Sequence, residues 1–116
     1  MRDVLLLLSG CLAVAIAITH GVLGETRVFA RARIEPPATK LLIHLVWQAG
    51  TVAWIGGGVL LICAGWFFVD PARRATILVL AVVFASAALA NAWATRGRHY
   101  GWMGMALVVV LALAGL

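Results

Sequence analysis

Four long apolar runs, separated by short charged stretches, limit what this 116-residue chain can fold into. The runs cover residues 4–24, 41–69, 76–95 and 101–116. Hydrophobic residues make up 65% of the chain and charged residues 11%, whereas a soluble domain of this size needs more charge to cover its surface. A run of about 20 apolar residues is long enough to cross a bilayer as a helix. The pattern predicts an all-α integral membrane protein, a single domain over residues 1–116 built as an up-down bundle of four transmembrane helices.

The first and last runs each have an alternative to a full transmembrane crossing. Residues 8–11 match a bacterial lipobox and residues 15–17 resemble a signal-peptidase site, so the first run has an alternative interpretation as a cleaved leader. The apolar run continues past both sites to Leu23, which favours a retained transmembrane helix. The last run would span only about 24 Å as a helix, so it crosses a bilayer marginally.

Small residues recur at helical spacing on the first two runs. Such stripes let the backbones of two membrane helices approach closely. We expect the first two helices to pack through these stripes, which are Ala13, Ala17 and Gly21 on one helix and Ala49, Ala53 and Gly57 on the other.

The distribution of cations predicts the orientation. With four crossings, both termini lie on one side, and the long loop 25–40 lies on the other together with the turn at Arg96. The loop side carries six cations, namely Arg27, Arg31, Arg33, Lys40, Arg96 and Arg98, and the other side carries Arg2, Arg73 and Arg74. The positive-inside rule then places the long basic loop in the cytoplasm of a bacterial-type inner membrane, with both termini on the opposite side. Topology and lipid headgroups explain the net charge of +5, and we expect no nucleic-acid partner.

Most polar side chains within the apolar runs fall at one end of the predicted bundle. His20 ends the first run, His44 begins the second and His99 follows the third, so connectivity places all three near one membrane face. Ionisable and amide groups at membrane depth are costly unless they face one another. We therefore expect one inward-facing cavity that opens on the loop side. Its other predicted residues are Thr19, Glu25, Gln48, Thr51, Asn91 and Thr95.

This polar group suits haem b or a transition-metal ion, because neutral imidazole is a common ligand of both. For haem b, the cofactor-binding residues would be His20 and His44, with Arg96 and Arg98 paired to the propionates. The chain has no HxxxH or CxxCH spacing, so this hypothesis rests on position alone. The ligands of a metal ion would be His20, His44, His99 and Glu25.

The interpretation that the sequence favours is simpler, because the same side chains can join helices by hydrogen bonds without any ligand. The protein would then be a structural or accessory subunit, in contact with the bilayer and with other membrane subunits or copies of itself. A small transporter or channel is a further alternative, since in size the chain resembles the small multidrug resistance transporters and the fluoride channels. It lacks the glutamate in the middle of the first helix of the former and the Phe-rich pore signature of the latter. Because no nucleophile has a base at matching depth, we predict no catalytic residues and lean against an enzyme.

Overall fold

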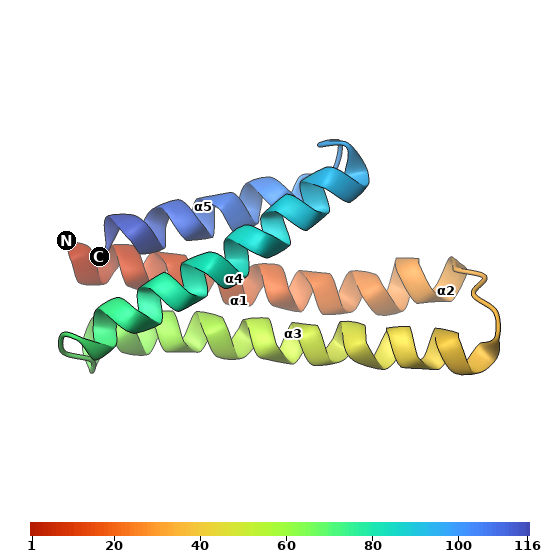
Figure 1. Ribbon diagram of the computed structural model, residues 1–116, viewed down its shortest axis with the longest axis horizontal. Coiled ribbons are helices and arrows are strands. Elements are labelled where there is room, and N and C mark those ends of the chain that lie inside the picture. The colour runs from red at the N-terminus through yellow and green to blue at the C-terminus, as the bar shows by residue number, and fades with distance from the viewer.

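The computed structural model describes all 116 residues, and it contains helices and turns without strands (Figure 1). The all-α prediction is confirmed. A short π-helical segment, η1, continues the first helix before the first loop, and the short α2 follows it. The elements in chain order are α1 (Arg2–Leu23), η1 (Gly24–Val28), α2 (Phe29–Arg31), α3 (Pro37–Trp66), α4 (Ala72–Thr95) and α5 (Gly101–Ala114).

The long helices form two antiparallel hairpins. α1 packs against α3 and α4 packs against α5, while α1–α5 and α3–α4 contacts join the two hairpins. Both chain termini and the α3–α4 turn lie at one end of the molecule (Figure 1). Toward the other end, the α4–α5 hairpin diverges from the α1–α3 hairpin, which extends further (Figure 1). We call the first end the terminal end and the second the loop end.

Three helical segments are long and apolar enough to cross a membrane, which indicates a membrane protein. They are the continuous stretch Arg2–Arg31 and the helices α3 and α4. The fourth apolar helix, α5, is shorter, with 14 residues. Membrane crossing by all four helices therefore remains a proposal.

Several helix boundaries differ from the prediction, and α4 begins at Ala72 rather than at residue 76. Helical structure in the first run continues beyond residue 24 to Arg31, because η1 and α2 extend it. α3 begins at Pro37 rather than at residue 41 and ends at Trp66 rather than at 69. A proline is compatible with the first turn of a helix, where its missing N–H leaves no bond unmade. The Pro36-Pro37 pair therefore starts α3 instead of separating it from the loop.

The buried core lies where all four long helices meet. Its largest fully buried side chain is Phe84 of α4. The buried Ser9 hydroxyl donates a hydrogen bond to the Val108 carbonyl oxygen at 2.8 Å, which links α1 to α5. The core cluster comprises Leu6, Ala13, Leu61, Ala64, Ile77, Leu80, Phe84, Val108 and Ala112.

The small-residue stripe on α1 is buried as predicted, with Ala13, Ala17 and Gly21 all in the interior. The stripe predicted on α3 is wrong, because Ala49 and Ala53 are exposed. Residues that do face α1 include Gly58, where a Cβ would lie 2.8 Å from the Gly10 carbonyl oxygen. Gly57 is buried against α4 instead, with Leu80 and Phe84 at 3.2 and 3.3 Å from an added Cβ. Successive helix positions point about 100° apart, so neighbouring glycines serve different helices.

Candidate functional site

A cavity of about 770 Å³ lies between the two hairpins. The side chains that α1, α4 and α5 contribute to its lining include small ones, which leave this volume unfilled. Several lining residues are exposed, so the cavity is partly open to the surroundings. Its lining is mainly apolar and aromatic. The lining residues are Ala15, Ile16, Thr19, His20, Leu23, Val28, Trp47, Trp54, Ala87, Ala90, Asn91, Thr95, His99, Tyr100, Gly101, Gly104 and Met105.

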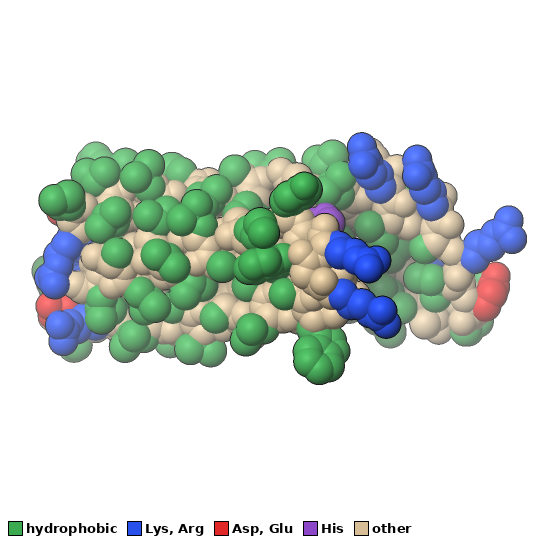
Figure 2. Space-filling model, turned by 90° about the horizontal axis from the view of Figure 1, so that it is seen from above, with side chains coloured by type: hydrophobic (Ala, Val, Ile, Leu, Met, Phe, Trp, Pro, Cys, Tyr) green, Lys and Arg blue, Asp and Glu red, His purple; other side chains and the backbone are tan.

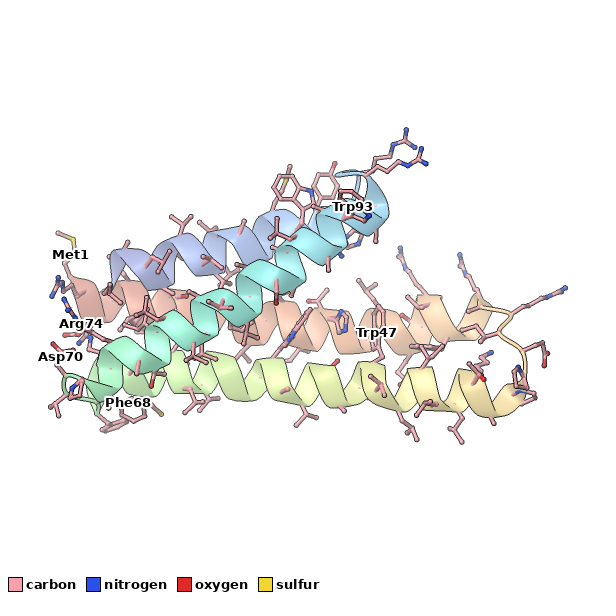
Figure 3. The ribbon with its side chains drawn as sticks, viewed as in Figure 1. Met1, Trp47, Phe68, Asp70, Arg74 and Trp93 are labelled. Carbon is pink, nitrogen blue, oxygen red and sulfur yellow. The ribbon has the colours of Figure 1, made fainter.

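His20 is held in an aromatic wall of this cavity. Its imidazole is parallel to the Trp47 indole, with ring centroids 4.0 Å apart and an interplanar angle of 5°. The Trp54 ring lies 4.7 Å away in a tilted arrangement. Trp47 projects from α3 toward α1 (Figure 3), where its indole N–H donates to the His20 carbonyl oxygen at 3.1 Å. Neither imidazole nitrogen of His20 makes a hydrogen bond, so both remain available to a ligand.

Asn91 provides a second unpartnered polar group in the cavity lining. Its side-chain oxygen is buried and has no hydrogen-bond partner. Buried polar atoms in folded proteins are rarely left in that condition, because an unmade hydrogen bond costs free energy. Thr95 does not supply the missing bond, since its hydroxyl donates to the Asn91 backbone carbonyl at 2.7 Å. The Asn91 amide oxygen is therefore an unsatisfied polar atom within the wall of the cavity.

His99 lines the cavity from the α4–α5 turn. Its Nδ1 accepts a hydrogen bond from the Gly101 backbone N–H at 3.0 Å. A neutral imidazole that accepts at one nitrogen carries its proton on the other. The Nε2 of neutral His99 is thus a hydrogen-bond donor, which is the wrong form for a metal ligand.

A second polar group lies between the extended end of α1 and α3. Glu25 Oε1 accepts hydrogen bonds from His44 Nε2 at 2.7 Å and from Gln48 Nε2 at 2.6 Å. Gln48 Nε2 also lies 3.2 Å from the Gly21 carbonyl oxygen. The Phe29 ring stacks on His44 with centroids 4.5 Å apart. Because Glu25 belongs to η1, its hydrogen bonds with His44 and Gln48 connect the π-helical segment to α3.

The residues predicted to share one cavity are therefore divided between two places. Thr19, His20, Asn91, Thr95 and His99 line the cavity. The Glu25–His44–Gln48 group lies outside its lining, and Thr51 is buried in the α1–α3 contact, against Gly21. Arg96 and Arg98 are exposed in the turn between Thr95 and His99.

Sequence reasoning missed the aromatic lining residues Trp47, Trp54 and Tyr100. A signal for the two tryptophans was present, because His44, Trp47, Thr51 and Trp54 recur at helical spacing along one stripe of α3. Tryptophan near the end of an apolar run is ordinarily an interfacial anchor. These tryptophans were therefore interpreted as anchors and not as part of a stripe that lines a cavity.

The histidines and acids do not gather around one point. The chain contains no group of three or more His, Cys, Asp or Glu side chains that could hold a metal ion together. The cavity instead has the usual form of a small-molecule site, namely apolar walls with a few convergent polar groups. Comparisons with protein-family models, with curated proteins and with solved structures find no match to this chain.

Proposed function

We propose that this protein is a small four-span membrane protein whose cavity binds an amphipathic molecule. The observation that carries the proposal is the cavity itself, which combines apolar walls with unpartnered polar groups at His20 and Asn91. Its volume of about 770 Å³ falls within the range of roughly 300–1,000 Å³ typical of ligand pockets. The protein would act as a binding or accessory subunit, alone, as copies of itself or beside other membrane subunits.

The proposed topology has four crossings, with the loop end in the cytoplasm and both termini outside. Supporting it, the two antiparallel hairpins put both termini at one end and the long basic loop at the other (Figure 1). The molecule is 48 Å long, and the hydrocarbon core of a bilayer is about 30 Å thick. The ends of the molecule would therefore reach the headgroup layers. As a helix, α5 is about 21 Å long, which is shorter than the hydrocarbon core is thick. The first residues of α5, at the loop end, would therefore lie below the headgroup layer.

Haem b is a second candidate for the ligand. Both ring nitrogens of His20 are free, and the ring faces a cavity walled by aromatic side chains. A single imidazole is a sufficient protein ligand for haem iron in several classes of haem protein. His44 is engaged by Glu25, so the expected pair of His20 and His44 is less suited than His20 alone. A bare metal ion has less support, because no three ligands converge.

The proposal is tested by filling the cavity. Ala90 lines the cavity and is exposed, so Ala90→Phe places a ring in the cavity without overpacking the core. Ala53→Phe is the matched control, because Ala53 is exposed on α3 and lies outside the cavity lining. Native mass spectrometry of protein released from detergent should detect a bound small molecule on the wild type and on Ala53→Phe, and much less on Ala90→Phe.

Two results would count against this function. One is a wild-type protein that carries no bound molecule after extraction in mild detergent. The other is equal retention by Ala90→Phe and the wild type. The absorption spectrum of the same samples separates the two candidates, since haem b gives a Soret band that His20→Ala should abolish.

A further inference from the structure

Two of the three arginines at the terminal end, Arg73 and Arg74, have an acidic partner, whereas the arginines at the loop end have none. Arg73 donates to Asp3 at 2.7 Å and to the Gly115 carbonyl oxygen at 3.2 Å, and Arg74 lies 4.0 Å from Asp70. At the loop end, no arginine takes part in an ion pair or a side-chain hydrogen bond. All of these loop-end arginines are exposed, and they are Arg27, Arg31, Arg33, Arg96 and Arg98.

The acids at the loop end do not neutralise these arginines. Glu25 is bound by His44 and Gln48, and Glu35 forms no ion pair. Lys40 donates to the Ala32 carbonyl oxygen at 3.0 Å and is held within the loop. The loop end therefore presents a group of free guanidinium ions, which favour phosphate and carboxylate groups.

Three of these cations are direct neighbours in the sequence of residues that line the cavity. Arg27 directly precedes the lining residue Val28 in η1. Arg98 directly precedes His99, and Arg96 directly follows Thr95. Figure 2 shows Lys and Arg side chains gathered around a His side chain on the loop-end half, beside a broad hydrophobic surface. An anionic head and an apolar chain would thus find complementary surfaces side by side.

We infer that the cavity ligand is an anionic glycerophospholipid, with an acyl chain in the cavity and its phosphate among the loop-end arginines. This inference rests on the proposed function and specifies its ligand. The headgroup level is the expected depth of these arginines, since the molecule is longer than the hydrocarbon core is thick. Clusters of basic residues at the membrane surface attract anionic lipids, and a neighbouring cavity adds the hydrophobic contribution of the chain.

The test uses delipidated full-length protein in detergent, titrated with phosphatidylglycerol, phosphatidylcholine or inorganic phosphate while its Tm is followed. A ligand that binds only the folded state stabilises it by RT ln(1 + [L]/Kd), so the Tm rises with ligand concentration relative to the Kd. Phosphatidylglycerol should raise the Tm, and the other two should have little effect. Arg27→Gln/Arg98→Gln should raise the Kd for phosphatidylglycerol by about 30-fold, because two surface cations near the lipid are lost.

The matched control is Arg2→Gln/Arg74→Gln, which removes the same number of charges at the terminal end and should keep the wild-type Kd. Equal stabilisation by phosphatidylcholine that Ala90→Phe abolishes would overturn the anionic lipid but leave the proposed function standing. An effect of phosphatidylglycerol that survives Ala90→Phe would place the lipid outside the cavity and overturn the inference. Equal stabilisation by inorganic phosphate would identify a free-phosphate site and also overturn it.

Discussion

The imidazole of His20 and the indole of Trp47 are joined twice, once by their rings and once through the backbone. The rings stack at 4.0 Å, and the indole N–H donates to the His20 carbonyl oxygen at 3.1 Å. This carbonyl lies near the end of α1, where the switch to η1 alters the helical hydrogen-bond pattern. One side chain of α3 therefore positions both the backbone and the ring of the cavity-lining histidine.

Replacing Trp47 should separate these two contributions. Trp47→Phe removes the hydrogen-bond donor but keeps an aromatic ring, so it should lower the free energy of unfolding by about 1 kcal/mol. Trp47→Leu also removes the stacking, which is worth roughly another 0.5–1.5 kcal/mol. Trp93→Leu is the control, since Trp93 is 88% exposed. Denaturant unfolding in detergent would measure the series, and an equal loss for Trp93→Leu would contradict this account.

The three adjacent glycines of α3 should differ in their tolerance of a larger side chain. A Cβ at Gly58 meets the Gly10 carbonyl oxygen at 2.8 Å, and one at Gly57 meets Leu80 at 3.2 Å. At Gly56, nothing lies within 4 Å of an added Cβ. Gly58→Leu and Gly57→Leu should therefore each destabilise the fold by about 1–3 kcal/mol or more, whereas Gly56→Leu should be tolerated. Thermal unfolding in detergent gives the order, and a destabilised Gly56→Leu would show that this face is covered.

Glu25 and His44 should behave as a coupled pair. Removing either one leaves the other without its short hydrogen bond, so Glu25→Ala and His44→Ala should each lower the Tm. The double variant should lose less than the sum of the two single losses, as expected for residues in direct contact. Glu35→Ala is the control, because Glu35 is exposed and forms no ion pair. Strict additivity in the cycle would show that the pair does not interact in the membrane.

The proposed topology predicts a labelling pattern. In a background with Cys11 and Cys63 replaced by serine, single cysteines are introduced at Arg2, Glu35 and Arg98. An impermeant thiol reagent should reach positions 35 and 98 from one side of the membrane and position 2 from the other. Labelling of positions 2 and 35 from the same side would show that the first helical segment does not cross.

The helices of this protein could be predicted from its sequence, because apolar runs of this length must satisfy their backbone polar groups within a helix. α5 begins at Gly101, where the fourth apolar run begins, and ends at Ala114. The helix ends were less predictable. The Pro36-Pro37 pair is compatible with either a loop or the start of a helix, and the structure begins α3 at Pro37.

The sequence also determined which polar residues share one end of the molecule, since connectivity alone brings His20, His44 and His99 to the loop end. Only the tertiary structure decided which of them line the cavity. Neighbouring positions on α3 point about 100° apart, so Trp47 faces the cavity while Gln48 binds Glu25. The π-helical segment adds a residue to the turn that carries Glu25, which changes its direction relative to His20. The partner that each of these side chains meets depends on how α1 and α3 pack along their whole length. That packing involves residues far from the site, such as Gly10 and Gly58.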